Sequence, residues 1–324
     1  MSSTKLPSVL IVSPALAEAN NGNWHTALRW SRMLRSHCRT TIVAQWQGEP
    51  HDAMIALHAR RSAPSIHRWA RERPGQALIV ALTGTDLYRD ILVDADAQRS
   101  LIEASDLVVL QEQGLAQLSH AAQAKCTVIH ASARPLRPMP LPRRGLRAIQ
   151  VGHLREEKDP ACFMRAARHL RERDDIGFLQ VGRALDDTLA AMARRTALDC
   201  PRYRWLGDLP RGVARQHVRH AQLLVSSSRM EGGAQVIVEA AQSGTAVIAS
   251  HIPGNVGMLG HEHAGYFEPG DDAALAKLIE RARDEPRFLA LLRQQTRARA
   301  PLFDPAEEQR RLVKLVTDAL ETPR

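Results

Sequence analysis

Two glutamates, Glu231 and Glu239, stand eight residues apart, and the pair Gly232 and Gly233 lies between them. On one continuous helix this spacing turns the second carboxylate about 80° away from the first, so both reach one ligand only if Glu231 lies in a loop and Glu239 in the helix that follows. Glycine amides can approach a phosphate closely, and a carboxylate can accept hydrogen bonds from two adjacent ribose hydroxyls. The segment predicts a nucleotide site; a surface helix with a glycine-rich entrance is the alternative.

Three potential cations, His153, Arg155 and Lys158, follow the apolar run that ends at residue 151. Pro160 suits the first turn of a helix and Asp159 its N-cap, which leaves Lys158 at the carboxyl end of a strand, just before the helix. Cations gathered at such a point can hold a diphosphate. A charge pattern on a surface turn explains the same residues, so both interpretations stay open here.

Polar turns in the first half of the chain give two further candidates. The turn at 20–23 leads into a helical pattern, where free backbone amides and the helix dipole favour an anion or a sugar hydroxyl; a long N-cap turn is the alternative. The second turn, Thr83–Asp86, follows an apolar run, and its Asp86 either caps the next helix or bonds hydroxyls. The residues of these segments that we expect to bind a second ligand are Gly22, Asn23, Thr26, Thr85 and Asp86.

Short apolar runs alternate with helical patterns, which is typical of βαβ units and parallel sheets. The strands expected in the first half are Ser8–Val12, Thr41–Gln45, Ala77–Leu82, Leu107–Leu110 and Thr127–His130. The helices expected there are Trp24–Arg35, Asp52–His58, Ser65–Glu72 and Leu87–Ala104. The candidate turns thus fall at the carboxyl ends of strands, where ligands of such sheets bind.

A proline-rich stretch at 134–145 forbids both a helix and a central strand, so it marks a domain boundary. The strands expected after it are Ala148–Gly152, Gly177–Val181, Tyr203–Leu206, Leu223–Ser226 and Ala246–Ala249. The helices expected after it are Pro160–Arg171, Asp186–Thr196, Ala234–Ser243, Asp271–Asp284 and Ala306–Leu320. We expect an α/β fold of two Rossmann-like domains that face a cleft, residues 1–145 and 146–300, and a terminal helix within 301–324 that could pack back on the first domain.

The composition is that of a globular protein with a basic bias. The chain of 324 residues has 44 Lys and Arg against 35 Asp and Glu, a formal net charge of +9. Anionic ligands fit this charge, but the arginines are scattered and aromatic residues make up only 4%, so we expect no nucleic-acid partner. No apolar run approaches the roughly 20 residues of a membrane span, and the four dispersed cysteines predict neither disulfides nor a zinc site. We therefore expect a cytoplasmic protein without membrane insertion.

The order of a strand, two serines, Glu231-Gly-Gly and then Glu239 resembles the E-x7-E donor-binding region of family-four glycosyltransferases, which have the GT-B architecture. The segment 152–158 resembles the same family's GRLxxxKG element, with Lys158 in the lysine place and His153 where arginine is usual. The resemblance implies that the second domain binds a nucleotide-sugar donor and the first domain the acceptor. It implies no cofactor, and no DxD-type pair is placed to hold a metal.

The site that follows from the residues and the resemblance divides into two groups, besides the acceptor residues already given. The expected catalytic residues are Lys158, Glu231 and Arg155. The expected donor-binding residues are His153, Arg183, Leu206, Arg229, Gly232, Gly233, Ala234, Glu239, Gly254 and Asn255.

A narrower resemblance covers blocks along nearly the whole chain, among them 81–90, 151–159 and 228–234, which are similar to the selenosugar synthases of selenoneine biosynthesis. It implies transfer of a hexosyl group from UDP-GlcNAc or UDP-glucose to selenophosphate. Selenophosphate is a nucleophile already ionised at neutral pH, so the reaction needs no strong general base. A downstream enzyme of the selenoneine pathway is a partner that this interpretation allows.

Three other functions remain open from the sequence. An ordinary family-four hexosyltransferase would use a hydroxyl acceptor, and a GT-B nucleotide-sugar epimerase would need no acceptor at all. A basic nucleic-acid-binding protein would show steep salt dependence. Incubation with a UDP-sugar, with and without an acceptor, separates the first two.

Overall fold

The computed structural model describes residues 6–16, 18, 22–139 and 144–321, and it divides into two compact units. The first unit contains Met1–Ala131 together with Pro305–Arg324, and the second contains Ser132–Asp304. The proline-rich stretch that begins at residue 134 thus belongs to the second unit, and the last helix belongs to the first. Each unit is a Rossmann-like α/β domain with a parallel sheet of its own.

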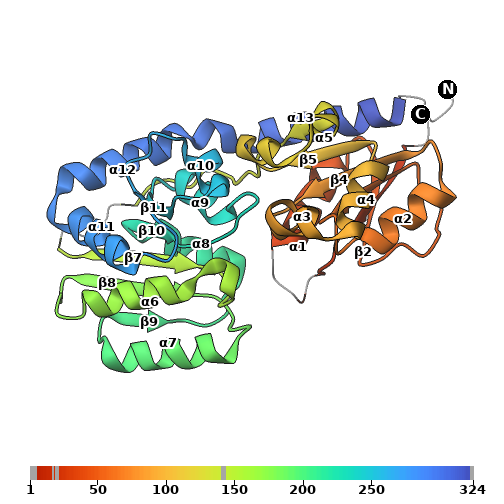
Figure 1. The fold of residues 1–324 in the computed structure, drawn as a ribbon. Helices are drawn as coiled ribbons and strands as arrows, with labels where there is room; N and C mark the ends of the chain where they lie inside the picture. Colours follow the sequence, from red (N-terminus) through yellow and green to blue (C-terminus); the bar gives the residue numbers. More distant parts are fainter. Residues whose placement is uncertain (1–5, 17, 19–21, 140–143, 322–324) are drawn as a thin grey trace. The chain divides into compact units, whose positions relative to one another are not determined.

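The described residues of the first unit form a six-stranded parallel sheet with helices on both faces (Figure 1). Its strands are β1 (Ser8–Val12), β2 (Arg39–Val43), β3 (Ala53–Leu57), β4 (Ala77–Leu82), β5 (Asp106–Val109) and β6 (Cys126–Val128). Its helices are α1 (Gly22–Leu34), α2 (Ala63–Glu72), α3 (Ile91–Val93), α4 (Ala95–Glu103), α5 (His120–Ala124) and α13 (Pro305–Glu321). The strands lie in the order β2-β1-β3-β4-β5-β6, so the order reverses between β1 and β3, the switch point where such sheets bind ligands.

Strand β3 shows why one sequence prediction is wrong. The residues 52–58 were expected to form a helix, because alanine, methionine and leucine favour helices in isolation. In the fold, Ala53, Ile55 and Leu57 pack with α1 and α13, while Met54 and Ala56 pack with α2 and α4 on the opposite face. All five side chains are fully buried. A central strand of a parallel sheet is covered on both faces, so its sequence is apolar throughout and lacks the alternation of apolar and polar residues that marks a half-exposed strand.

The continuous helix expected at Leu87–Ala104 is also wrong in part. The segment begins with a π-helical turn at Asp86–Asp90, continues as α3, and restarts as α4. Asp94 separates the two α-helices, because its backbone is extended and its carboxylate accepts the amide of Ala97 at 2.9 Å as the N-cap of α4. π-helical turns are rare and occur often at functional sites.

Helix α13 is fastened to α1 by a buried carboxylate. Glu308 is 2% exposed; its two oxygens each accept from Nε of Arg29 at 2.9 Å, and one of them accepts from Nε1 of Trp30 at 2.8 Å. The last helix of the chain thereby completes a core of the first unit.

Removing this carboxylate is expected to destabilise the first unit. Glu308→Ala leaves the Arg29 guanidinium without its buried counter-ion, so the free energy of unfolding should fall by about 3–5 kcal/mol, as measured by urea denaturation. The neighbouring Glu307 is 34% exposed and pairs with Arg310 and Arg311 on the surface, so Glu307→Ala should cost less than about 1 kcal/mol. An equal loss of unfolding free energy in the two variants would contradict a stabilising role for the buried Glu308 carboxylate.

The described residues of the second unit also form a six-stranded parallel sheet. Its strands are β7 (Leu146–Val151), β8 (Ile176–Val181), β9 (Tyr203–Trp205), β10 (Leu223–Ser226), β11 (Ala246–Ser250) and β12 (Tyr266–Phe267). Its α-helices are α6 (Pro160–His169), α7 (Asp187–Asp199), α8 (Arg211–Arg219), α9 (Gln235–Ala241), α10 (Pro253–Leu259), α11 (Asp272–Asp284) and α12 (Pro286–Ala298). The strands lie in the order β9-β8-β7-β10-β11-β12, so the switch point of this sheet lies between β7 and β10.

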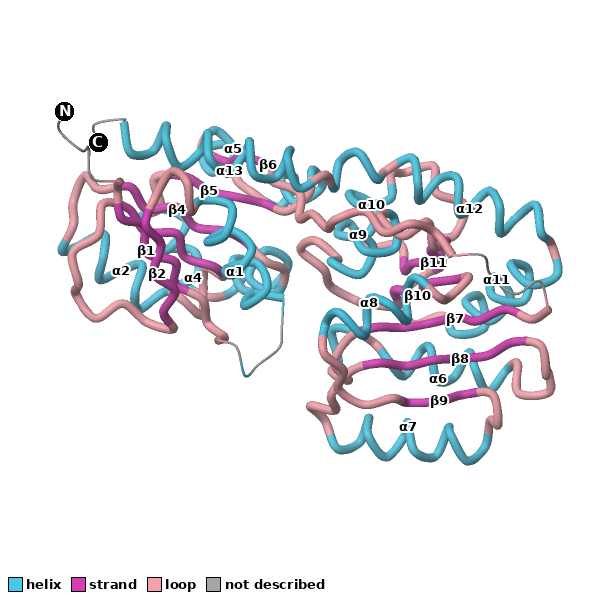
Figure 2. The backbone as a smooth tube through the Cα atoms, turned by 180° about the vertical axis from the view of Figure 1, so that it is seen from behind, coloured by secondary structure: helices cyan, strands magenta, loops and turns pink. Residues whose placement is uncertain are grey.

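Helices cover both faces of the second sheet. Residues of α6, α7, α11 and α12 pack into one apolar core with the strands; Figure 1 shows α6 in front of the sheet near β8 and β9, and α7 beyond β9. On the other face lie α8 and α9 (Figure 2). The sequence analysis did not predict α8, α10 or α12. The loops that follow β7 and β10 lie at the carboxyl edge of the sheet, and they carry the candidate site.

Candidate functional site

The loops after β7 and β10 meet at the switch point of the second sheet and bring Lys158 onto Glu231. The Nζ atom of Lys158 lies 2.5 Å from Oε1 of Glu231, and the hydroxyl of Ser228 donates to the same oxygen at 2.5 Å. Glu231 is only 8% exposed, so its charge is compensated by these neighbours rather than by water. An anionic ligand at this edge would compete with Glu231 for the ammonium of Lys158.

Two glycines lie beside the loop that carries the lysine. A Cβ atom on Gly182 would lie 1.9 Å from the carbonyl oxygen of Gly152, and the φ of Gly182 is +147°, so no other residue fits there. The side-chain carbons of Lys158 pass Gly152, with Cγ and Cδ 3.5 Å from the point that a Cβ atom would occupy. Gly182 thus lets the loop after β8 pack against the backbone of the loop after β7, and the Lys158 side chain lies within van der Waals distance of Gly152.

The second glutamate lies in α9, whereas Glu231 lies in the loop before that helix. Glu239 is 4% exposed, and Nε of Arg211 lies 3.1 Å from its Oε1 atom. Arg211 begins α8, a helix that the sequence analysis did not predict, so nothing in the pattern singled it out. In the fold it holds the Glu239 carboxylate in place.

The predicted residues at the ends of β7, β8 and β9 lie close together. The amide of Arg183 donates to Nδ1 of His153 at 3.2 Å, and the guanidinium of Arg183 is 2.8 Å from Oδ2 of Asp208. Arg155 forms a longer ion pair, 3.8 Å, with Glu157. Leu206 is half-buried and follows β9. His153, Arg155 and Arg183 are therefore partly or fully exposed side chains at the carboxyl ends of β7 and β8, and the two arginines supply the positive charge there.

Arg229 ties the two loops of the site together. Its Nε atom lies 3.0 Å from Oδ2 of Asp159, and its backbone amide donates to the carbonyl of Glu157 at 2.9 Å. The residues that follow it toward α9 are buried or half-buried. Of these, Gly232 and Ala234 are buried and Gly233 is half-buried.

Gly254 and Asn255, which we expected to bind the donor, lie in the first turn of α10. A Cβ atom on Gly254 would lie 1.9 Å from the carbonyl oxygen of Glu231, so glycine allows α10 to touch the Glu231 loop. Asn255 is fully buried, and its Nδ2 donates to the carbonyl and the hydroxyl of Ser250, both at 3.0 Å. Ser250 in turn donates to the carbonyl of Ser228. Asn255 thus supports the loop, and we propose for it a positioning role in place of direct donor contact.

In the first unit, Asp86 and His58 join the ends of β3 and β4. Asp86 is fully buried and accepts hydrogen bonds from the amides of Ala59, Thr83 and Gly84 at 2.8–2.9 Å. Its carboxylate thereby links the loop after β3 to the loop after β4. Asp86 caps and organises these loops, and its oxygens face backbone amides instead of the solvent.

His58 is a buried neighbour of Thr85 that the sequence analysis did not single out, because it was placed at the end of the wrongly predicted helix. It has φ +73° and is 2% exposed, directly after β3. The amide of Arg61 donates to Nδ1 of His58 at 3.2 Å, and Nε2 lies 2.9 Å from the hydroxyl oxygen of Thr85. Burial lowers the pKa of His58, although Asp86 and Asp90 oppose this, so the neutral ring carries its proton on Nε2.

This arrangement orients the hydroxyl of Thr85. Because Nε2 of His58 donates to the Thr85 oxygen, the hydroxyl hydrogen of Thr85 is left to donate elsewhere. Thr85 is partly exposed. Gly22, Asn23 and Thr26 lie in the first turns of α1, where Thr26 is buried and the other two are not; Asn20 and Asn21 fall outside the described residues.

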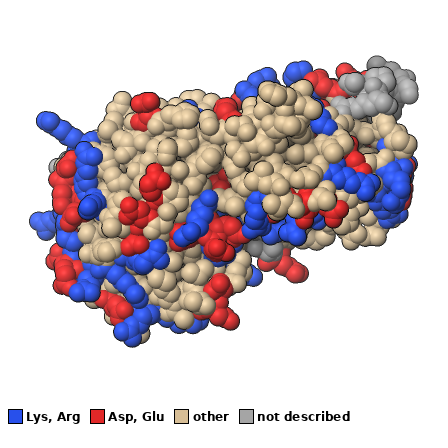
Figure 3. Space-filling view, viewed as in Figure 1, with Lys and Arg blue, Asp and Glu red and all other residues tan. Residues whose placement is uncertain are grey.

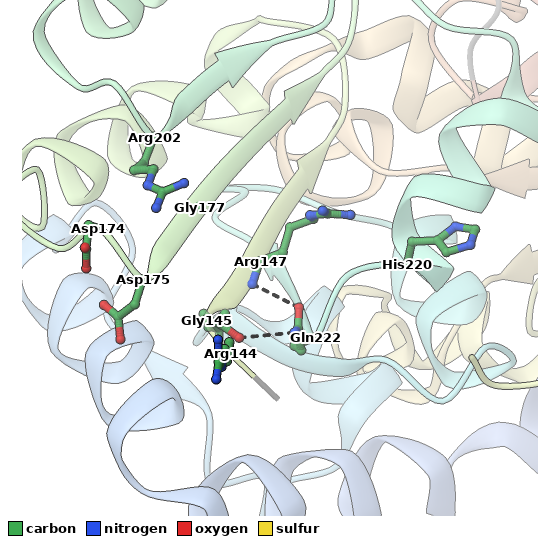
Figure 4. Close-up of a pocket in the computed structure, with 10 residues that line it drawn as sticks. Arg144, Gly145, Arg147, Asp174, Asp175, Gly177, Arg202, His220 and Gln222 are labelled. Carbon is green, nitrogen blue, oxygen red and sulfur yellow. Dashed lines mark hydrogen bonds between the residues drawn. The ribbon is translucent and has the colours of Figure 1, made fainter. Parts of the chain in front are cut away.

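A depression of about 390 Å³ lies at the opposite, amino edge of the second sheet. Figure 4 shows Gln222 at its floor, where it accepts from the amide of Arg147 and donates to the carbonyl of Gly145. Its rim carries Arg202 and Asp175. This depression lies at the ends of the strands remote from Lys158, so we assign it no part in the site.

The surface charges are mixed rather than gathered. On the face seen in Figure 3, basic and acidic side chains alternate over each unit. Many arginines are paired, as Arg173 is with Asp175 and Asp284. In the part of the chain that the structure describes, no group of His, Cys, Asp or Glu is arranged to hold a metal ion. None of the described helices has the length and apolar character needed to cross a bilayer.

Solved structures with both domains resemble this chain closely in fold. Sucrose-phosphate synthase from Thermosynechococcus elongatus has a TM-score of 0.77 at 16% identity, over 97% of this chain and 99% of that one. HepE from Anabaena, solved in complex with UDP and glucose, has a TM-score of 0.75 at 14% identity, over 96% and 100%. TarM from S. aureus, in a complex that contains UDP, has a TM-score of 0.67 at 14% identity over 83% of this chain, which spans only 55% of the TarM chain.

These identities establish likeness of fold, and the family follows from the sequence. The model of the family described as glycosyl transferases group 1 matches residues 139–300, half of the chain. The matched segment contains both loops of the Lys158 and Glu231 contact. The chain therefore belongs to the group 1 family of glycosyl transferases.

Proposed function

We propose that this chain transfers a hexosyl group, N-acetylglucosaminyl or glucosyl, from a UDP-sugar to selenophosphate. The selenium atom attacks the anomeric carbon, the bond from that carbon to the UDP oxygen breaks, and UDP leaves with the electron pair. Hydrolysis of the selenium–phosphorus bond then releases the selenosugar and phosphate. The product would enter selenoneine biosynthesis.

The contact between Lys158 and Glu231 carries the donor half of the proposal. It places a cation at the switch point of the second sheet, where a leaving diphosphate develops negative charge. We assign Lys158, with Arg155 or His153, to that diphosphate. The solved relative HepE binds UDP and glucose, which supports a donor of this class.

We assign the two glutamates to different parts of the donor. Glu239, held by Arg211, suits the ribose hydroxyls. Glu231 and the amides of Gly232 and Gly233 suit the sugar and its phosphate. Arg183, Leu206, Arg229, Ala234 and Gly254 complete the proposed donor contacts, with Asn255 as support.

Two observations support the proposed acceptor. Residues 81–90 are similar to the selenosugar synthases, and the hydrogen bonds of His58 fix its ring. The Nδ1 lone pair of His58 is occupied by the amide of Arg61, and its Nε2 proton faces Thr85. A histidine held in this way donates through Thr85 and does not take a proton from an incoming hydroxyl. This favours an acceptor that arrives ionised, as selenophosphate does. Gly22, Asn23, Thr26, Thr85 and Arg229 are the proposed acceptor contacts.

The proposal is tested by the release of UDP. Purified protein is incubated with UDP-N-acetylglucosamine or UDP-glucose alone, with selenophosphate, with inorganic phosphate as the matched anion, and with a free sugar as a hydroxyl acceptor. We expect UDP only with selenophosphate. Release with a sugar hydroxyl instead would identify an ordinary hexosyltransferase, and an isomerised UDP-sugar without any acceptor would identify an epimerase.

The hydroxyl of Thr85 gives a prediction for the acceptor. Thr85→Val removes the donor that His58 orients, and it keeps the shape of the side chain. We expect the KM for selenophosphate to rise about tenfold, while the KM for the UDP-sugar stays within twofold, because one hydrogen bond to a charged group contributes about 1.5–3 kcal/mol. Thr85→Ser should retain most of the wild-type affinity. Equal KM values for Thr85→Val and wild type would remove Thr85 from the acceptor site.

A further inference from the structure

Four polar side chains cross the core face of the second sheet just below its switch point. They are Tyr203 on β9, Gln180 on β8, Gln150 on β7 and Ser227 directly after β10. All are buried, with exposed fractions of 2%, 1%, 5% and 0%. The remainder of this face is apolar and packs against α6, α7, α11 and α12. An aliphatic side chain would suit each place in a parallel sheet, so the four polar groups need a reason.

The first three residues form a chain of hydrogen bonds with one direction. The hydroxyl of Tyr203 donates to Oε1 of Gln180, and Nε2 of Gln180 donates to Oε1 of Gln150 at 2.8 Å. Burial raises the pKa of Tyr203, so its hydroxyl keeps its proton and remains a donor. Gln150 and Gln180 are direct partners in the register of β7 and β8, which places their side chains next to each other on one face.

The series of hydrogen bonds ends on the backbone of Lys158 and Asp159, in the loop after β7. Nε2 of Gln150 donates to the hydroxyl oxygen of Ser227 at 2.5 Å and to the carbonyl of Lys158 at 3.3 Å. The hydroxyl of Ser227 donates to the carbonyl of Asp159 at 2.8 Å. Asp159 has φ +39° and ψ +56°, a left-handed conformation that residues with a side chain adopt rarely, Asp and Asn more often than most.

We propose that Tyr203, Gln180, Gln150 and Ser227 act as a positioning relay that fixes the turn at Lys158 and Asp159, and so holds the ammonium of Lys158 at the diphosphate of the donor. This inference rests on the donor half of the proposed function. A buried polar network gains little stability over apolar packing, because each group must first leave water. Its effect is to specify one geometry, and here the group specified is the backbone that carries Lys158.

The test compares Gln150→Leu with a matched loss of a buried hydrogen bond elsewhere in the second unit. Thr296 is fully buried in α12, and its hydroxyl donates to the carbonyl of Leu292 at 2.8 Å, so Thr296→Val is the control. Hydrogen–deuterium exchange of the amides in 156–162 is measured without ligand, and UDP affinity is measured by calorimetry. We expect Gln150→Leu to speed exchange in 156–162 at least tenfold and to weaken UDP binding at least tenfold, whereas Thr296→Val changes neither.

The two readouts separate the relay from the proposed function. Unchanged exchange at 156–162 in Gln150→Leu overturns the relay, whatever UDP does. Faster exchange with unchanged UDP affinity overturns the claim that the relay serves the donor. If wild-type protein does not bind UDP, the proposed donor fails, while the exchange data still decide whether the relay holds the turn. Ser227→Ala removes only one oxygen and gives the same test if Gln150→Leu does not fold.

Discussion

Lys158→Ala is expected to lower kcat by about 10²–10³-fold, with a smaller change in the KM for the UDP-sugar. The charge on the leaving diphosphate develops in the transition state, so a cation that meets it there accelerates the chemical step more than it strengthens ground-state binding. Lys158 is suited to this role because its ammonium already lies at the switch point, 2.5 Å from Glu231. Steady-state kinetics of UDP release measure both constants.

A second lysine of the same unit provides the control for this prediction. Lys277 lies on α11 and is exposed, so Lys277→Ala should leave kcat and KM within twofold of wild type. Removing Lys158 also leaves Glu231 nearly buried without its cation, and Glu231→Gln in the same background should not restore activity if the lysine acts on the ligand. Full recovery in that double variant would show that Lys158 serves only to neutralise Glu231.

Glu239→Ala is expected to raise the KM for the UDP-sugar by about tenfold to a hundredfold with a smaller loss of kcat. The ribose lies away from the reacting carbon, so a carboxylate that binds it does so equally in the ground state and the transition state. Calorimetric titration with UDP should show the same loss of affinity, because UDP retains the ribose.

Arg211, which pairs with the Glu239 carboxylate, provides a second variant for this experiment. Arg211 is paired with Glu239 at 3.1 Å, so Arg211→Ala should weaken UDP binding less than Glu239→Ala and in the same direction. Glu172→Ala, at a side chain that is 88% exposed, serves as the control for loss of a negative charge. Wild-type UDP affinity in Glu239→Ala would remove Glu239 from the donor site.

Most strands of both sheets were predictable from the sequence, because a buried parallel strand is a short apolar run that ends at a turn. Ser8–Val12, Ala77–Leu82 and Leu223–Ser226 have the bounds that their apolar runs predict. The failure at β3 has a physical cause, since Ala53-Met-Ile-Ala-Leu57 contains good helix formers and becomes a strand only because neighbours bury both of its faces. Its misassignment also concealed His58.

Residues that act through packing could not be predicted. Gly254 lies in the first turn of α10, and the need for glycine there is explained by the backbone of Glu231, which belongs to a separate loop. Likewise, Arg211 pairs with Glu239 on another helix, and Gln150 bonds Gln180 on another strand, so the sequence alone does not reveal these partners. By contrast, the meeting of the loops after β7 and β10 follows from the parallel topology, which brings the carboxyl ends of neighbouring strands together.

The proposed transfer is tested most directly by the mass spectrum of its product. The protein is incubated with UDP-N-acetylglucosamine or UDP-glucose and freshly prepared selenophosphate, and each substrate is omitted in turn. We predict a hexose derivative with the selenium isotope pattern, formed together with UDP and only when both substrates are present. UDP release or sugar isomerisation without any selenium-bearing hexose would contradict the proposed acceptor.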